Sequence, residues 1–265
     1  MKEGLKKYIK YVIVTVLIIY LVWFIFHNFI ISGYEKDKNF VNKHVTVAVI
    51  NLDRSPHRLR EMTDILKEYG FDRIDRINGI DGKAVSRKQD LPTYEGLPCL
   101  SPETDSAHLT HTACYLSHLK ALKYAMVESP TEWTLILEDD AKFYKNPKML
   151  MKILARCIKK STRREEIIWL TYNTSAGYLV NKEGAQLFYS YLNQHSDFTR
   201  DFKKNYNKVC LHDWAMAKVF EKIPYTHYPG FIGQREGLVS DITGNNESKP
   251  FVSRLRDFFF SFEYY

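Results

Sequence analysis

Residues 133–140 read Trp133-Thr134-Leu135-Ile136-Leu137-Glu138-Asp139-Asp140, an apolar run that ends in three acids. A short apolar run that polar residues stop abruptly predicts a buried strand. The acids then lie at the carboxyl end of that strand, which is the side where ligands bind in open α/β sheets. Taken alone, the triplet is a weak signal that a solvated turn or a helix cap explains better than a ligand site does, so the flanking segments decide its meaning.

The segment upstream predicts a strand–helix–strand unit. His44–Leu52 is rich in β-branched residues and predicts a buried strand. Ser55 is suited to cap a helix that has Pro56 at its first position, and Gly70 is suited to end it. Arg73–Ile77 predicts the next strand. This order of elements favours parallel strands.

Downstream, helices and extended segments continue to alternate. The predicted helices are Thr110–Val127, Pro147–Lys159, Lys182–Leu192 and Leu211–Phe220, and the predicted extended segments are Ile167–Thr171, Gly177–Val180 and Pro224–Tyr228. Polar loops are expected at residues 83–108 and 195–208. We therefore predict one α/β domain over residues 44–265, with a mostly parallel central sheet.

The amino-terminal segment predicts a membrane anchor. Tyr11–Ile31 carries no charged side chain, apart from His27 if it is protonated, and as a helix it would span about 30 Å. Lysines precede it, which by the positive-inside rule keeps the amino terminus cytoplasmic. The expected organisation is a cytoplasmic tail (1–10), a transmembrane signal anchor (11–31) and a polar stem (32–43). This predicts a single-pass type II membrane protein, facing the ER or Golgi lumen in a eukaryote, with a cleaved signal peptide as the alternative.

Charge and cysteine content exclude some classes of protein. The net charge is +7, and residues 1–40 supply +3 of it from six Lys against three acids. No block of Lys and Arg lies in the remainder, so we predict no nucleic-acid partner. The four Cys form no CxxC pair, which excludes a zinc ribbon, and their disulfide pairing cannot be read from the sequence.

Three polar motifs follow predicted strands: Asn51–Arg54, Asp81-Gly82 and Glu138–Asp140. The carboxyl ends of parallel strands meet at one edge of the sheet, so these motifs are expected to line one pocket. Carboxylates one or two residues apart at a strand end are suited to hold Mn²⁺ or Mg²⁺ beside a diphosphate. The predicted metal ligands are Glu138, Asp139 and Asp140.

The order of short motifs along the chain carries a family likeness. The motifs are Val49–Arg54 with Arg58, Ile80–Gly82, Ala113–His118, Leu135–Ala141, Gly177–Val180 with Gly184-Ala185, Asp213-Trp214, Gln234 and Ser240–Ile242. Together they resemble glycosyltransferase family 25, which includes bacterial lipooligosaccharide galactosyltransferases and eukaryotic procollagen galactosyltransferases. The resemblance covers roughly residues 45–242, and its specificity comes from the order of the motifs.

The resemblance implies a GT-A fold and a metal-assisted, inverting hexosyltransferase. The donor would be a nucleotide sugar such as UDP-galactose, and the acceptor a glycan or a hydroxylated protein. The implied donor-contacting residues are Asn51, Leu52, Arg54, Arg58, Asp81, Gly82, Ser117 and His118. Inversion needs a general base for the acceptor hydroxyl, and Asp213 is the candidate.

Other interpretations stay open at this stage. The chain could be an inactive relative that serves as a binding or scaffold subunit, or a metal-dependent phosphoesterase that uses the same acidic cluster. His111, Cys114 and His118 recur on one helix face at a spacing compatible with zinc, although packing of Cys114 in the core explains it as well. His227 is a further candidate metal ligand.

Overall fold

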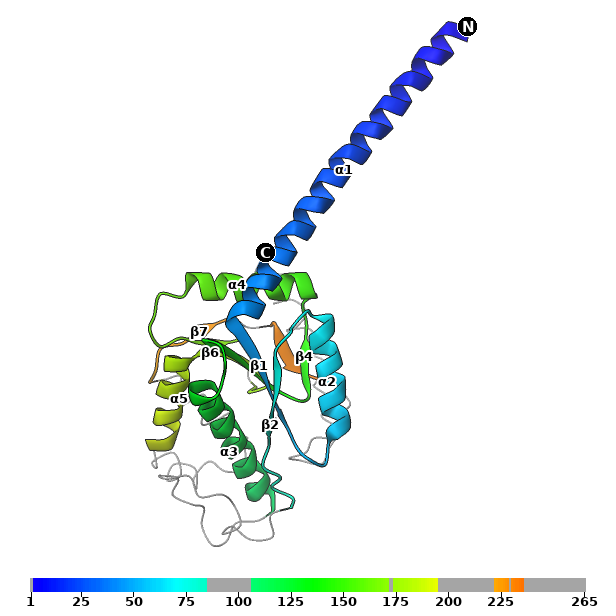
Figure 1. The fold of residues 1–265 in the computed structure, drawn as a ribbon. Helices are drawn as coiled ribbons and strands as arrows, with labels where there is room; N and C mark the ends of the chain where they lie inside the picture. The colour runs from blue at the N-terminus through cyan, green and yellow to red at the C-terminus, as the bar shows by residue number, and fades with distance from the viewer. Residues whose placement is uncertain (1, 85–105, 172–173, 195–221, 229, 236–265) are drawn as a thin grey trace.

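The structure is a computed structural model that describes residues 2–84, 106–171, 174–194, 222–228 and 230–235. A six-stranded sheet lies between two layers of helices (Figure 1). Its strands, in spatial order, are β2 (Ile74–Asn78), β1 (Val45–Asn51), β3 (Trp133–Glu138), β6 (Gly177–Asn181), β5 (Ile167–Trp169) and β7 (Thr226–His227). Two short strands, β4 (Ala141–Phe143) and β8 (Ile232–Gln234), form a separate antiparallel pair.

The central sheet is mostly parallel, which confirms the predicted fold class at this level. β1 pairs in parallel with β2 and β3, and β5 pairs in parallel with β7. β6 instead runs antiparallel to both β3 and β5. Residues 170–176 join β5 to β6, and a parallel crossover needs about a dozen residues or more. This short connection therefore forces the antiparallel step.

The helices begin and end close to where the sequence predicts them. They are α1 (Lys2–His44), α2 (Pro56–Glu68), α3 (Ser106–Val127), α4 (Pro147–Lys160) and α5 (Lys182–Gln194). Asn181 caps α5, because its Oδ1 accepts a hydrogen bond from Gly184 N at 2.8 Å. Ser55 differs from its prediction, because its side chain makes no capping bond to α2. Gly70 follows α2 with a φ of 88°, as its predicted role in ending the helix requires.

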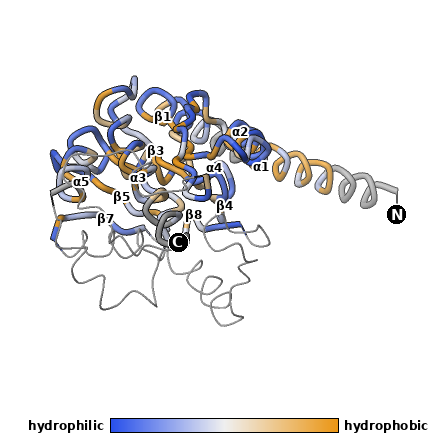
Figure 2. The backbone as a smooth tube through the Cα atoms, turned by 90° about the horizontal axis from the view of Figure 1, so that it is seen from below, coloured by the Kyte–Doolittle hydropathy of each residue, from blue (hydrophilic) through white to orange (hydrophobic). Residues whose placement is uncertain are grey.

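Strand alternation divides the core into two halves. On one face of the sheet, residues such as Ile50, Ile136 and Tyr178 pack with α3 and α5. On the other face, residues such as Val49 and Leu137 pack with α2 and α4. Successive side chains of a strand point to opposite faces, so each strand contributes to both halves. Figure 2 shows these apolar stretches gathered along the strands in the centre of the domain.

The last turns of α1 are part of the domain. Asn42 donates from Nδ2 to Gly70 O at 2.8 Å, and Asp37 Oδ1 accepts from Lys159 Nζ on α4 at 3.0 Å. The same ammonium lies 4.5 Å from the centre of the Phe40 ring. Residues 32–43, predicted as a separate stem, thus continue α1 without a break, and the helix projects from the domain towards its amino terminus (Figure 1).

The prediction of a type II membrane anchor is wrong. Within the part of the chain that the structure describes, no helix is both long and apolar enough to cross a bilayer. The predicted signal anchor, membrane contact and lumen-facing address are therefore not retained.

Candidate active site

A pocket lined by both charged and apolar residues opens at the carboxyl ends of β1 and β3. It encloses about 690 Å³, its mouth included. Its lining residues are Ile50, Asn51, Leu52, Arg54, Arg58, Ile80, Asp81, Gly82, Thr110, Cys114, Ser117, His118, Glu138, Asp139, Asp140 and Gln234. The structure thus brings together every predicted donor-contacting and metal residue.

Asp139 points towards α2 and is held there by two donors. Asn51 donates from Nδ2 to Asp139 Oδ2 at 2.7 Å, and Arg58 Nη1 lies 3.4 Å from Asp139 Oδ1. All three residues are buried. Asn51 also donates to Ser55 O at 2.9 Å, which fixes the turn between β1 and α2. Arg58, predicted to contact the nucleotide, therefore also neutralises a buried carboxylate.

Glu138 points the other way, towards α3. His118 Nε2 lies 3.3 Å from Glu138 Oε1, and the Ser175 hydroxyl donates to the same oxygen. His118 Nδ1 lies 3.1 Å from Tyr178 Oη, and the two rings stack at 5.9 Å. Burial alone would raise the pKa of Glu138, but the hydrogen bond and charge of His118, helped by Ser175 and Gln234, hold that pKa below its ordinary value. Glu138 is thus a carboxylate at neutral pH.

Asp140 is the acid whose charge is least compensated. Its Oδ1 is buried and has no hydrogen-bond partner among the described residues. Burial, then the charges of Glu138 and Asp139, raise the pKa of Asp140 to about 8, although Arg58 and Arg235 oppose this. A divalent cation at this oxygen would supply the missing partner and favour the ionised form. The Asp140 oxygen therefore fits a hard cation, while Glu138 and Asp139 are held by different partners, His118 and Asn51 respectively.

An ion pair covers the other end of the pocket. Arg54 Nε lies 2.6 Å from Asp81 Oδ2, which ties the loop after β1 to the loop after β2. Both side chains are partly exposed, so a ligand can reach them. Arg54 is the cation best placed to meet an anionic ligand at this end, because Arg58 is occupied by Asp139.

Ser117 connects α3 to the loop that carries Asp81 and Gly82. Its hydroxyl donates to Ala113 O at 2.7 Å and accepts from Ile80 N at 2.8 Å. Ser117 is 3% exposed. The predicted contact of this side chain with the donor is therefore indirect, because its hydroxyl positions the loop.

We expect Ser117→Ala to weaken binding of UDP several-fold and to lower stability by about 1 kcal/mol, because Ile80 N loses its acceptor. Isothermal titration calorimetry with UDP and thermal melting measure the two effects. Ser129→Ala is the matched control, since Ser129 is a buried serine that hydrogen-bonds Thr134 away from the pocket. If both variants bind UDP equally well, the loop-positioning role of Ser117 is wrong.

Sequence patterns missed Arg235, a residue that supports the site. Its backbone N donates to Asp140 O at 2.8 Å, and its guanidinium donates to Asp139 O and to Glu61 Oε2. Arg235 follows β8, a three-residue strand that pairs with β4 directly after the acidic triplet. Strands this short give no usable periodicity, so only their pairing shows that Arg235 lies here.

Other residues named from the sequence do not appear in the described pocket, most of them because they lie outside the described residues. Asp213 and Trp214 lie outside the described residues, as do Cys99 and Cys210. His227 lies on β7, where its Nε2 is 2.9 Å from Thr171 O, and it does not line the pocket. The roles assigned to Asp213 and to the pocket residues stay predictions.

The fold and the pocket define the class: an α/β protein with an acidic ligand site at the carboxyl edge of its parallel strands. Residues 44–175 match the sequence profile of glycosyltransferase family 25 (LPS biosynthesis protein). The chain belongs to this family, which confirms the resemblance seen in its motifs.

Two further comparisons found similar proteins. A Glycosyltransferase 25 family member of Drosophila pseudoobscura pseudoobscura is 30% identical over 104 residues, which cover 37% of this chain and 16% of that protein. The chain thus matches about a sixth of that relative's length. A crystal structure of a glycosyltransferase involved in the glycosylation of the major capsid of PBCV-1 aligns with a TM-score of 0.41 and 16% identity, over 70% of this chain and 81% of the other.

Proposed function

We propose that the chain is a metal-assisted hexosyltransferase that transfers a sugar, with galactose favoured, from a UDP-sugar to a glycan or a hydroxylated protein. The observation that carries this proposal is the pocket itself. Residues from separate sequence motifs line one cavity at the sheet edge. The chain that carries this cavity belongs to glycosyltransferase family 25. A GT-A type of domain and an inverting reaction are part of the proposal.

The acidic side of the pocket is suited to a nucleoside diphosphate held through a cation. Asp140 offers an oxygen without a hydrogen-bond partner, and Mn²⁺ or Mg²⁺ takes oxygen ligands of this kind. When bound, the cation would neutralise charge that builds on the departing diphosphate. Asn51 and Arg58 hold Asp139, and Arg235 holds the backbone of the same turn, so Asp140 is kept in place.

The other side of the pocket is suited to hold the rest of the donor. Arg54 and Asp81 join two loops across its mouth, and the backbone at Gly82 is buried in its wall. Arg54 presents a guanidinium that can exchange Asp81 for an anionic oxygen of the donor. Leu52 and Ile80 add apolar surface, which suits the face of a nucleobase or a sugar.

The test is a donor screen with the full chain, with and without a chelator. We expect one UDP-sugar to be hydrolysed slowly without acceptor, and the reaction to stop when the divalent cation is removed. Absence of UDP binding and of UDP release from every UDP-sugar would favour the inactive scaffold interpretation. Release of inorganic phosphate from a phosphate monoester would favour the phosphoesterase.

Asp213 is the proposed general base, on the strength of the family resemblance. Asp213→Asn is expected to leave UDP-sugar binding intact and to slow transfer by at least about 10²-fold, which is typical for a lost general base. Single-turnover transfer and equilibrium donor binding separate the two quantities. Transfer at a near-normal rate would move the base to another residue.

A further inference from the structure

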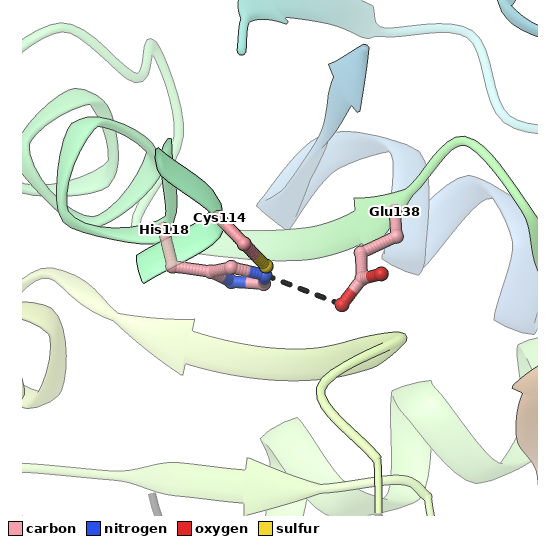
Figure 3. A group of neighbouring side chains, drawn as sticks. All are labelled: Cys114, His118 and Glu138. Carbon is pink, nitrogen blue, oxygen red and sulfur yellow. Dashed lines mark hydrogen bonds and ion pairs between the residues drawn. The ribbon is translucent and has the colours of Figure 1, made fainter. Parts of the chain in front are cut away.

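Three potential metal ligands from two elements converge inside the pocket, on the side away from Asp139. They are the Cys114 thiol and the His118 imidazole, one helical turn apart on α3, and the Glu138 carboxylate at the end of β3 (Figure 3). Their ligand atoms all lie within 4.8 Å of one another. We propose that Cys114, His118 and Glu138 form a binding site for a thiophilic divalent cation, of which Zn²⁺ is the natural candidate.

The distances between the ligand atoms fit such a site. Zn²⁺ binds Cys sulfur at about 2.3 Å and His nitrogen or carboxylate oxygen at about 2.0–2.2 Å. Ligand atoms of a tetrahedral site are therefore separated by roughly 3.3–3.8 Å. His118 Nε2 and Glu138 Oε1 already lie 3.3 Å apart. The Cys114 Sγ lies within 4.8 Å of both of these atoms, about 1 Å beyond the separation that a tetrahedral site requires.

Neighbouring groups orient the ligands in the way that zinc sites require. The second ring nitrogen of a metal-bound histidine usually donates to a fixed acceptor, which sets the tautomer. His118 Nδ1 has such a partner in Tyr178 Oη at 3.1 Å, and this leaves Nε2 directed at Glu138. Tyr178 is itself buried and stacks on Trp169 at 5.1 Å, while the Ser175 hydroxyl donates to Glu138 Oε1. The three ligands are thus preorganised by residues that pack in the core.

The chemistry of the donor set separates this site from the one proposed at Asp140. Thiolate and imidazole prefer Zn²⁺, whereas carboxylate oxygens prefer Mn²⁺ and Mg²⁺. Binding would release the Cys114 proton to solvent and leave a fourth position open towards the pocket. Three protein ligands and one open position are typical of zinc sites that are reached by small molecules. The inference does not depend on glycosyl transfer, since it concerns metal binding alone.

Cobalt(II) is the probe, because it takes the place of Zn²⁺ and gives a near-ultraviolet charge-transfer band only when a thiolate binds it. Titration of the reduced, metal-free full chain with Co²⁺ should produce this band with a stoichiometry of one. Added Zn²⁺ should abolish the band, and excess Mg²⁺ should leave it unchanged. A chain that shows no band would overturn the proposal.

Variants assign the band to these residues. Cys114→Ser should remove the band, while Cys157→Ser, at a buried cysteine on α4, should keep it. Glu138→Gln should weaken Co²⁺ binding, and Ser175→Ala should weaken it by about 10-fold, as for other outer-shell partners. Circular dichroism of each variant checks that it is folded. A band that survives Cys114→Ser, or disappears with Cys157→Ser, would show that the thiolate lies elsewhere.

Discussion

Asp140→Asn is expected to make the protein more stable above neutral pH and to abolish cation-dependent binding of UDP-sugars. Burial and the neighbouring acids raise the pKa of Asp140 to about 8, from an ordinary value of 3.8. Between these values the folded state holds a proton that the unfolded state has lost, so the free energy of unfolding falls as pH rises from about 4 to about 8. Asparagine does not ionise, so the free energy of unfolding of the variant does not fall in this pH range for this reason.

The expected gain in stability is large enough to measure. A shift of a single pKa unit corresponds to about 1.4 kcal/mol, and 1 kcal/mol moves the melting temperature of a domain of this size by about 2–4 °C. We therefore expect Asp140→Asn to melt at least about 3 °C above wild type at pH 8, and equal to it near pH 4. Asp64→Asn is the control, because Asp64 is an exposed acid on α2 and should show no gain.

The same substitution, expected to raise stability, is expected to remove the response of the protein to divalent cations. Mn²⁺ should raise the melting temperature of wild type and release a proton on binding below pH 8, because the cation needs the ionised form of Asp140. Neither effect should occur with Asp140→Asn, and UDP-sugar binding by the variant should no longer respond to chelator. A variant that binds UDP-sugar with unchanged sensitivity to chelator would show that Asp140 is not the cation ligand.

Arg58→Met is expected to destabilise the protein by about 3–5 kcal/mol, the usual effect of removing one partner from a buried ion pair. Arg58 and Asp139 are both nearly buried, and the change removes the arginine that faces the Asp139 carboxylate while its hydrogen bond from Asn51 remains. The corresponding fall in melting temperature is about 6–20 °C. In chemical denaturation, the free energy of unfolding should fall with denaturant concentration at the same slope in the variant as in wild type, which would confirm that the change is in stability.

A control and a double variant separate the structural role of Arg58 from contact with the donor. Arg60→Met changes an exposed arginine of the same helix and should cost little. Arg58→Met combined with Asp139→Asn should be less unstable than the sum of the single changes, because the unpaired charge is gone. An Arg58→Met protein that melts like wild type but binds UDP weakly would instead make Arg58 a donor-contacting residue.

Much of the fold follows from patterns that the sequence carries locally. The β-branched run at β1, Pro56 at the start of α2 and the glycine after it predict a strand, a helix and its end, and all three are observed. The apolar run from Trp133 likewise predicts β3 with the acids at its end. These elements are readable because each is long enough for a period of two or of 3.6 residues to show.

Elements that depend on distant partners were not readable. β4 and β8 are three residues each and are strands only because they pair with one another. The antiparallel direction of β6 follows from the short connection over residues 170–176, and residue propensities do not predict the direction of a strand. The apolar segment of α1 predicted a membrane span, and the helix described by the structure does not meet that requirement.

The acidic triplet shows the same division. By itself the sequence determined that Glu138, Asp139 and Asp140 end a buried strand beside two other polar strand ends, and in this it located the pocket. Only the tertiary structure decided what each acid does there. Glu138 is the last residue of β3 and meets His118 and Cys114, whereas Asp139 and Asp140 lie in the turn that follows. In that turn, Asp139 meets Asn51 and Arg58, and Asp140 keeps an oxygen for which the described chain supplies no donor. Three adjacent carboxylic acids thus acquire different partners. Those partners come from α2, α3 and other segments distant in the sequence, and only tertiary packing brings them together.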